Sequence, residues 1–500
     1  MVAVVATVAV SAPAQAAPPV PDATWTTRTV APGVQIRTGV LRETDAKPSW
    51  TVTVRAAGSA PVGGRSWADS TAGRLRAAGF VPRVERVDWP GYSDTPHGTL
   101  GWRVRVGSYG GQDEARSVSA KVAESGFDPV ADWTGYDAQQ PADRQSVHLA
   151  VIDPGAFTGT VEATHGSSVA DRERTSSLAA RLRSLVAVNG GFFVTSGADG
   201  VPGTTAGLSV HHGALDSMAV GSRAALVLAD GGRRARIADL TSTVTARAGS
   251  SRYAVEGVNR VPGAVRNCGR PGGVPTERPR QDVTCTRADD LVAFTPRFRT
   301  DLPTGPGAQV VLDADGRVVA AGARGGTVPD GGSVLQGTGA AADWLTAEGR
   351  PGTRIALTET VRDTSGHQVR WDGDDSVVSA APTLVEGGRI AVDAATEGTL
   401  DPRDPAFGYA WSNARQPRTM AGIDGRGRLL LATVDGRQPG VSAGFTLLEA
   451  ARFMRSLGAR EALNLDGGGS SAMAVDGALV NVPSDAAGER AVGDTVQVLP

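Results

Sequence analysis

The segment "TLLEAARFMRSLGAREALNLDGGGSSAM", residues 446–473, predicts a helix, a strand and a glycine-rich loop in immediate succession. Thr446 and Glu449 have the spacing of a capping box at a helix start, and Gly458 is a typical stop signal. The apolar run "ALNL" is typical of a strand and delivers Asp466 to its carboxyl end. Ligand sites favour such strand ends, where side chains and backbone N–H groups converge. We therefore expect a functional site at this loop.

Three adjacent glycines after a carboxylate need a reason, because glycine loses more conformational freedom on folding than any other residue. A turn uses one or two glycines, so the third indicates that a ligand approaches the backbone. The N–H groups of such a turn can form an anion-binding nest. The two serines lack the G-x-S-x-G spacing of a hydrolase nucleophile, and we interpret them as hydrogen-bond donors. The candidate binding residues of the loop are Gly467, Gly468, Gly469, Ser470 and Ser471.

Three other stretches follow or interrupt apolar runs and supply polar side chains: "NGGFF" (189–193), "QPRTMAGID" (416–424) and "ATVDGR" (432–437). Among them, the guanidinium of Arg418 matches two phosphate oxygens. Paired carboxylates suit cleavage of a glycosidic or phosphodiester bond, since one protonates the leaving oxygen while the other directs water or attacks carbon. The candidate catalytic residues are Asp466, Asp435 and Glu449, and the further candidate binding residues are Asn189, Gly190, Arg418, Thr419 and Asn464.

Each of these residues also has a plainer interpretation. Asp435-Gly436 and Asn189-Gly190 both have the composition of an ordinary turn. Glu449 is most simply the capping-box partner of Thr446. Arg418, taken alone, is compatible with a surface position. The sequence therefore leaves open how the carboxylates divide their roles.

In this order, "VNGGFF", "PRTMAGID…GRLLLATVDGR" and the segment 446–473 resemble the phosphodiester glycosidase family, which is related to the mammalian enzyme that uncovers mannose 6-phosphate by removing N-acetylglucosamine. The resemblance covers residues 147–500. It implies hydrolysis of a sugar joined through its anomeric carbon to a phosphodiester, with the glycine-rich loop at the active site. Wall teichoic acid and other phosphate-bearing glycans are the candidate substrates. Residues 252–301 do not match this pattern, and we interpret them as a candidate insertion that shapes specificity.

Residues 47–137 contain the same strand–helix–strand unit twice. Alternating strands flank helices expected over 68–78 and about 113–125, and a glycine closes each helix. The stretch "RVRVGSYGGQDEA" resembles the SPOR domain family, which implies binding to peptidoglycan glycan strands. A generic βαββαβ spacer is the alternative, because many small domains share this layout. Residues 137–146, "DAQQPADRQS", have the composition of a linker.

The first residues point to export. An apolar run leads to Ala14-Gln15-Ala16, the pattern of a signal peptide over residues 1–17, although no positively charged start precedes it. The run is too short for a secure membrane span. Cys268 and Cys285 enclose a loop rich in Gly, Pro and Arg, and a disulfide between them fits an exported protein. Two unpaired thiols are the alternative.

The composition predicts a β-rich protein. The chain has 65 glycines and 30 prolines among 500 residues, with Val, Thr and Arg in short runs. Its net charge is −2 and its basic residues are scattered, which argues against nucleic acid or an anionic membrane as a partner. We expect an α+β fold: a β-rich domain with a mixed sheet and few helices over residues 147–500, preceded by the small βαββαβ domain.

No cofactor or metal is expected from these patterns. The run Asp313-Ala314-Asp315-Gly316 lacks the glutamate that closes a calcium-binding loop, so it predicts a hairpin turn. The favoured hypothesis is a secreted, wall-associated hydrolase that takes a phosphate-linked glycan as substrate and is held on peptidoglycan by its N-terminal domain. A non-catalytic wall-glycan-binding or exopolysaccharide-associated protein is the alternative. The presence of Asp435, Asp466 and Arg418 together favours the enzyme.

Overall fold

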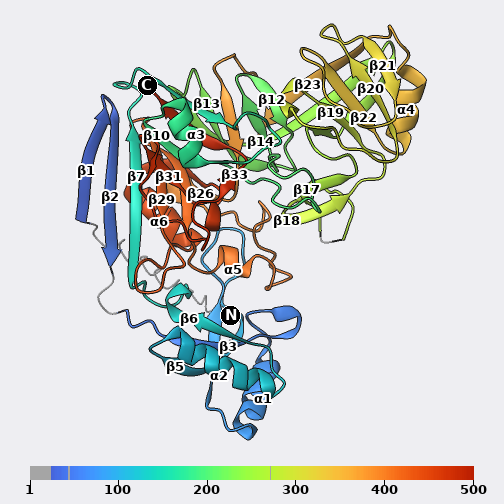
Figure 1. Ribbon diagram of the computed structural model, residues 1–500. Coiled ribbons are helices and arrows are strands. Elements are labelled where there is room, and N and C mark those ends of the chain that lie inside the picture. Colours follow the sequence, from blue (N-terminus) through green and yellow to red (C-terminus); the bar gives the residue numbers. More distant parts are fainter. Residues whose placement is uncertain (1–23, 43–45, 271) are drawn as a thin grey trace, which may run out of the picture.

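The computed structural model describes residues 24–42, 46–270 and 272–500. The predicted signal peptide, residues 1–17, lies outside these ranges. The described residues form mainly β-sheets, with six α-helices among them (Figure 1). This confirms the predicted β-rich α+β class.

One of the two eight-stranded sheets is antiparallel throughout, with the order β1-β2-β7-β29-β28-β30-β26-β27. Helix α6 (Leu447–Ser456) packs against its β30 end, and the capping box between Thr446 and Glu449 is confirmed. Gly458 follows the helix with φ +91°, as a stop signal requires. The strands are β1 (Thr24–Ala31), β2 (Val34–Arg42), β7 (Arg144–Ile152), β29 (Leu429–Val434), β28 (Arg418–Asp424), β30 (Ala459–Asn464), β26 (Thr383–Glu386) and β27 (Arg389–Ile390).

Two strands of this sheet precede the small N-terminal domain in the chain. Strand β2 pairs with β7 from Val34↔Ile152 to Arg42↔Arg144, and β1 pairs with β2. The range 147–500, predicted for the large domain, therefore leaves out two strands of its own sheet. The small domain separates β2 from β7 in the chain, so no local sequence pattern indicates that these two strands pair.

A second sheet of five strands, β32-β31-β10-β34-β8, packs on the first. Val188 of β10 and Val496 of β34 share one apolar core with Ala421 and Leu463 of the first sheet. This packing brings the end of β10 beside the end of β30. Helix α3 (Thr175–Leu182) packs on β10 and β31, and β9 (Glu173–Arg174) pairs with β33 (Ala491–Val492). The strands are β32 (Ala478–Leu479), β31 (Met473–Val475), β10 (Val186–Asn189), β34 (Thr495–Leu499) and β8 (Thr160–Thr164).

A third sheet follows the order β12-β11-β25-β13-β14-β23-β24, with β15 paired to β14. It leads from the body of the molecule to the outlying sheet with α4 at the upper right of Figure 1. Its strands are β12 (Ala214–Ser217), β11 (Ser209–His211), β25 (Ser376–Ser379), β13 (Arg223–Ala229), β14 (Arg234–Ala248), β23 (Ile355–Asp363), β24 (Gln368–Val369) and β15 (Ser251–Val255).

The outlying sheet has the order β16-β19-β22-β20-β21 and is mixed, because β16 and β19 run parallel. The run Asp313–Gly316 lies in the β20–β21 connection, so the predicted hairpin is confirmed. A separate hairpin of β17 and β18 carries the Cys268–Cys285 disulfide, which confirms that pairing. The elements are β16 (Gly257–Val258), β19 (Leu291–Phe294), β22 (Ser333–Gly337), β20 (Ala308–Leu312), β21 (Val318–Gly322), α4 (Ala340–Glu348), β17 (Ala264–Cys268) and β18 (Pro279–Thr286).

The small domain is a four-stranded sheet, β4-β5-β3-β6, with two helices, and it lies at the bottom of Figure 1. Its order along the chain is the predicted βαββαβ. Gly79 and Gly126 follow the two helices with φ +87° and +81°, as the stop signals predicted. The elements are β3 (Trp50–Val54), α1 (Arg65–Ala77), β4 (Pro82–Asp88), β5 (Thr99–Tyr109), α2 (Gln112–Glu124) and β6 (Pro129–Trp133).

The linker-like segment after this domain is tied to the large domain. Arg415 is buried and donates hydrogen bonds to the carbonyl oxygens of Gly135, Asp137 and Gln140 at 3.0, 2.8 and 2.7 Å. It also forms a 2.6 Å ion pair with Glu449 on α6. The segment 137–146 has the polar composition of a linker, but its start is bound to the large domain.

None of the helices in the described residues is long and apolar enough to cross a membrane.

Candidate active site

Strand β30 ends at Asn464, and Asp466 follows it beside the end of β10. The Asp466 N–H donates to the Gly190 carbonyl oxygen at 3.0 Å, and the Asn189 side-chain amide donates to the Asp466 carbonyl oxygen at 2.7 Å. The Asn189 Oδ1 atom accepts from the Thr419 hydroxyl at 2.6 Å and from the Ala472 N–H at 3.1 Å. Asn189 and Thr419 are both fully buried. The structure thus brings these predicted residues together as the frame that holds the loop.

The glycine loop forms a short 3-10 turn, η4 (Gly468–Ser470). The Gly467 N–H donates to Asp466 Oδ1 at 2.9 Å, and the Gly468 N–H donates to the Pro417 carbonyl oxygen at 2.9 Å. The N–H groups of Ser470 and Ser471 donate within the same turn. Most donors expected of an anion nest are therefore committed inside the protein.

The glycines allow close approach, but the approaching groups are the protein's own. Gly468 has φ +61°, a conformation that side-chain-bearing residues rarely adopt. A Cβ at Gly469 would lie 2.1 Å from Arg490 Nη2 and 2.3 Å from Asp485 Oδ1. The triple glycine thus lets charged side chains pack against the loop that follows Asp466.

The Asp466 carboxylate has an unusual proton affinity. Its removal from water raises its pKa to about 7. The Asp282 carboxylate on β18 adds to the rise, while hydrogen bonds from Ser470 and the Gly467 N–H, together with the charge of Arg490, oppose it. A carboxyl group with a pKa in this range is suited to acid–base chemistry near neutral pH.

Two arginines that we did not predict lie beside this loop. Arg437 is exposed, and its Nη2 would lie 3.0 Å from a Cβ at Gly468. Its Nε donates to Gln416 Oε1 at 2.6 Å. Arg490 pairs with Asp485 at 2.7 Å and reaches the Ser470 hydroxyl at 3.5 Å. Arg437 lies two residues after Asp435 in the quoted stretch "ATVDGR". This position was the one sequence feature that could have identified Arg437 as a site residue.

Asp435 lies after β29 in an enclosed position. Its Oδ1 accepts from the Val482 N–H at 3.0 Å, and its Oδ2 lies 3.4 Å from His148 Nε2. The side chain is only 5% exposed. These contacts hold the 435–437 turn against the segment that leads to Arg490. A catalytic role for Asp435 stays a prediction.

Glu449 has two structural partners. It completes the capping box with Thr446, and its carboxylate receives both the Nε and Nη2 hydrogen bonds of Arg415. Its contacts therefore join α6 to the small domain. The structure shows the plainer interpretation, in which Glu449 is a capping residue. The predicted catalytic role of Glu449 stays a prediction.

Arg418 is fully buried, and most N–H groups of its guanidinium donate to carbonyl oxygens of the protein itself. Its Nε donates to the Phe445 carbonyl oxygen at 3.0 Å, and Nη2 donates to the Trp411 carbonyl oxygen. Nη1 has no partner among the described residues. Asn464 likewise donates to the Ala381 carbonyl oxygen at 3.0 Å. Binding of substrate by these two residues stays a prediction.

Gly190 is positioned by a further residue that the sequence did not reveal. The Gly190 and Gly191 N–H groups donate to the Asp494 carbonyl oxygen and Oδ1 at 2.9 and 2.8 Å. A Cβ at Gly190 would meet Asp494 Oδ1 at 2.3 Å. Burial raises the pKa of Asp494 to about 6. Asp494 therefore supports the turn that receives Asp466.

A cavity of about 590 Å³ lies under the disulfide hairpin. Residues of the predicted insertion, 252–301, form much of its wall, including Glu256, Arg260, Arg266 and Glu277. The same hairpin carries Asp282, whose charge acts on Asp466. The segment without a family pattern thus lies near the candidate site.

Comparison with known proteins follows this division of the chain. A family model described as phosphodiester glycosidase matches residues 307–499, and the SPOR domain model matches residues 48–132. The crystal structure of a putative exported protein from Burkholderia pseudomallei K96243 has a TM-score of 0.85 and 34% identity, covering 97% of this chain and 98% of that one. A hypothetical protein from Synechocystis shares the fold, with a TM-score of 0.55 at 16% identity, covering 95% of this chain and 75% of that one.

Among curated proteins, N-acetylglucosamine-1-phosphodiester alpha-N-acetylglucosaminidase of Mus musculus is 31% identical over 110 residues, which is 22% of this chain. The match spans about a fifth, 21%, of that relative's length. The fold and the two family models together define a β-rich domain of the glycosidase type that is joined to a small βαββαβ domain. Residues 307–499 are thus a phosphodiester glycosidase domain, and residues 48–132 are a SPOR domain.

Proposed function

We propose that the chain is a hydrolase that removes a sugar from a sugar-1-phosphodiester, with Asp466 as the proton carrier. The observation that carries the proposal is the position of Asp466 at the glycine loop, where the guanidinium groups of Arg437 and Arg490 also lie; the raised pKa of Asp466, about 7, agrees with this role. The charge of Asp466 raises the pKa of Arg437, and the charge of Arg490 lowers the pKa of Asp466. These three groups therefore share one site, together with the Asp485 carboxylate that pairs with Arg490. Such a combination suits an anionic substrate whose leaving oxygen takes a proton.

The chemistry follows from the charges. A phosphodiester carries one negative charge, which Arg437 and Arg490 are placed to neutralise. Neutral Asp466 donates its proton to the phosphate oxygen as the bond from that oxygen to the anomeric carbon breaks. Water adds to the anomeric carbon, and the proton it releases returns to Asp466. The products are a free sugar and a phosphomonoester.

The remaining residues hold this arrangement. Asp435 positions the turn that carries Arg437, and Asn189 and Thr419 fix the loop from below. The segment 252–301 contributes the Asp282 charge and the wall of the neighbouring cavity, which supports its role in specificity. The domains in this proposal are residues 47–137 for the wall and residues 147–500, with β1 and β2 added, for the chemistry.

The location of the protein belongs to the same proposal. We place it outside the cell, with the SPOR domain holding it on peptidoglycan glycan strands and the phosphate-linked glycan substrate in the wall or its surroundings. The SPOR match, the disulfide and the exported relative support this location. The predicted signal peptide is part of the proposal and lies outside the described residues.

A substrate panel tests the function. The purified chain is offered N-acetylglucosamine, glucose and galactose 1-phosphodiesters, with the aryl glycoside of each sugar as a matched compound that lacks phosphate. We expect release of free sugar and phosphomonoester from at least one phosphodiester and none from its aryl partner. Binding without turnover across the panel would instead identify a glycan-binding protein.

A further inference from the structure

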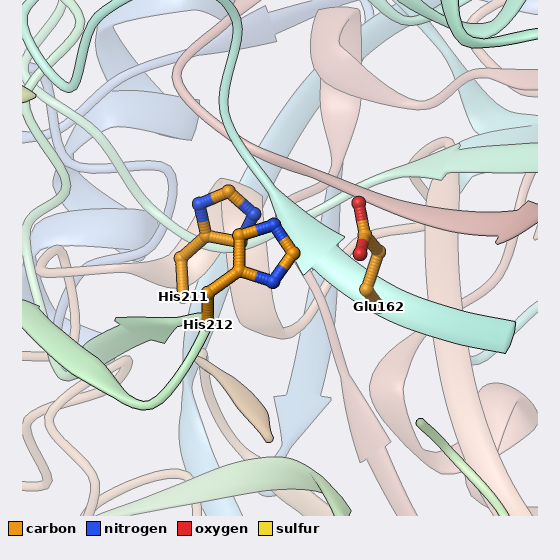
Figure 2. A group of neighbouring side chains, drawn as sticks. All are labelled: Glu162, His211 and His212. Atoms are coloured by element: carbon orange, nitrogen blue, oxygen red, sulfur yellow. The ribbon is translucent and has the colours of Figure 1, made fainter. Parts of the chain in front are cut away.

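A cluster of histidines and carboxylates lies where the second and third sheets meet. Glu162 belongs to β8, His211 ends β11, and His212 begins the turn to β12. One ligand atom from each of the three lies within 4.8 Å of the other two. Figure 2 shows the two imidazoles beside each other with the Glu162 carboxylate across from them. Three residues from two sheets thus converge on one point.

His211 carries the strongest sign that the cluster has a ligand. Both of its ring nitrogens are shielded from water and have no hydrogen-bond partner among the described residues. A buried polar atom without a partner costs about 1–3 kcal/mol, so native proteins rarely leave one unused. The imidazole nitrogens are therefore in place for a group that the chain itself does not supply.

The surroundings fix His211 and His212 in position. Arg297 Nη1 donates to the His211 carbonyl oxygen at 2.7 Å. His212 has φ +47°, a left-handed conformation that is costly for a residue with a side chain and that recurs at ligand sites. The strained residue is the one that turns its ring toward Glu162 (Figure 2).

We propose that Glu162, His211 and His212 bind one divalent transition-metal ion, with zinc as the best match. Imidazole and carboxylate ligands are those of zinc sites, whereas calcium and magnesium prefer oxygen ligands alone. Ligands on one tetrahedral zinc lie about 3.4 Å apart for bonds of about 2.0–2.1 Å. Because His212 is exposed and Glu162 is half-buried, small side-chain rotations can close the present separation.

A neighbouring trio, His165, His211 and Asp216, also has ligand spacing but fits a cation less well. Asp216 Oδ1 already pairs with Arg297 Nε at 3.0 Å, and Oδ2 lies 2.8 Å from His165 Nε2. A guanidinium bound to the same carboxylate repels a cation. His165 and Asp216 therefore pack beside His211 and hold it in place. The imidazole rings of His165 and His211 meet edge to face, with 5.1 Å between their centroids.

The site differs from the hydrolase site in residues and in role. A metal ion held here would join β8 of the second sheet to the β11–β12 turn of the third, so it would stabilise the fold rather than act on substrate. Thr164, the last residue of β8, pairs with Thr495, which directly follows Asp494 in the chain. Metal binding is thus expected to stiffen the frame of the Asp466 loop.

Zinc binding to the full chain tests the proposal. Chain stripped with chelator is dialysed against zinc chloride, and bound zinc is counted per chain while melting temperature is followed. We expect one tightly bound zinc and a rise in melting temperature. His212→Asn, which keeps a residue tolerant of the left-handed backbone, and Glu162→Gln should each weaken binding at least about 10-fold and remove the rise.

His97→Asn is the matched control, because His97 is exposed and lies in the small N-terminal domain, between β4 and β5. It should bind zinc as the unaltered chain does. Absence of bound zinc in the unaltered chain, or zinc binding and stabilisation that survive both His212→Asn and Glu162→Gln, would overturn the proposal.

Discussion

At the scale of single residues, the raised pKa of Asp466 makes a prediction about stability. Its folded-state pKa of about 7 exceeds the ordinary aspartate value of about 3.9. Between these values the folded state binds the extra proton, so stability falls as pH rises through this window and the penalty is complete above pH 7. Asp466→Asn removes the charge, and its melting temperature relative to the unaltered chain should rise from pH 4 to pH 8.

Thermal melting of both proteins across this range checks the sign. Asp113→Asn serves as the control, since the Asp113 side chain is 98% exposed, and its difference from the unaltered chain should stay nearly constant. A constant difference for Asp466→Asn as well would show that the carboxylate is ordinary.

Gly468 makes a second prediction at this scale. Gly468→Ala places a methyl group 3.0 Å from Arg437 Nη2 and strains a backbone with φ +61°. The strain costs about 1–2 kcal/mol, and displacement of Arg437 should lower turnover about 10- to 100-fold.

Gly427→Ala is the matched control. Gly427 has φ +76° with open space around its Cβ, so it carries the same strain without touching the site. Similar melting losses with a turnover loss in Gly468→Ala alone are expected. Equal turnover for the two variants would mean that the loop is only a permissive turn.

Single residues also show where sequence reasoning succeeds and where it stops. Asp466 and its glycines could be found because their chemistry is written in adjacent positions. Arg490, Asp485 and Asp494 reach the site from the connections between the last strands of the chain, and no spacing near Asp466 points to them. Arg418 has the right chemistry in the sequence, but its burial and its carbonyl partners are decided by tertiary packing.

At the scale of elements, helix α6 tests the role of Glu449. Thr446→Ala removes only the cap and should cost about 1 kcal/mol. Glu449→Ala also leaves Arg415, whose side chain is 3% exposed, without its carboxylate, and should cost about 3 kcal/mol or more. Turnover per folded molecule should stay near that of the unaltered chain in both variants.

Denaturant unfolding gives the stabilities, and kinetics on the best substrate of the panel gives turnover. Glu449→Gln adds a decisive comparison, because glutamine can keep the capping box while losing the charge. Loss of turnover in Glu449→Gln with a native unfolding curve would establish the catalytic role and contradict the structural one.

The elements themselves follow a simple rule of predictability. Helices α1, α2 and α6 were located within a few residues, because their periodicity and stop signals are local. The pairing partners of the strands could not be predicted, since antiparallel neighbours such as β2 and β7 are far apart in the chain. The same limit hid the histidine cluster: the pair His211-His212 is visible in the sequence, but Glu162 joins it only through sheet packing.

At the scale of the whole molecule, the register of β2 and β7 allows the small domain to be removed cleanly. Arg42 and Arg144 are partners, so a short turn can replace residues 43–143 while β1 and β2 stay in their sheet. Turnover of a soluble substrate should be retained, whereas retention on isolated cell walls should be lost. A lower melting temperature is also expected, because Arg415 loses three carbonyl acceptors.

Tyr92→Phe is the control for this deletion. It removes only the hydrogen bond from the Tyr92 hydroxyl to the Ser412 carbonyl oxygen and keeps the small domain, so wall retention should persist. Joint loss of turnover and wall binding in a deleted protein that still unfolds in one cooperative transition would mean that both domains build one catalytic unit.

The most direct test of the account is the turnover number of Asp466→Asn on a sugar-1-phosphodiester, measured beside its melting curve. The substitution keeps the shape of the side chain but removes the group that carries the proton. We predict a fall of about 100- to 10,000-fold with the fold intact, the range that loss of a general acid–base group produces. Turnover near that of the unaltered chain, from a protein that melts natively, would contradict the assignment of the chemistry to Asp466.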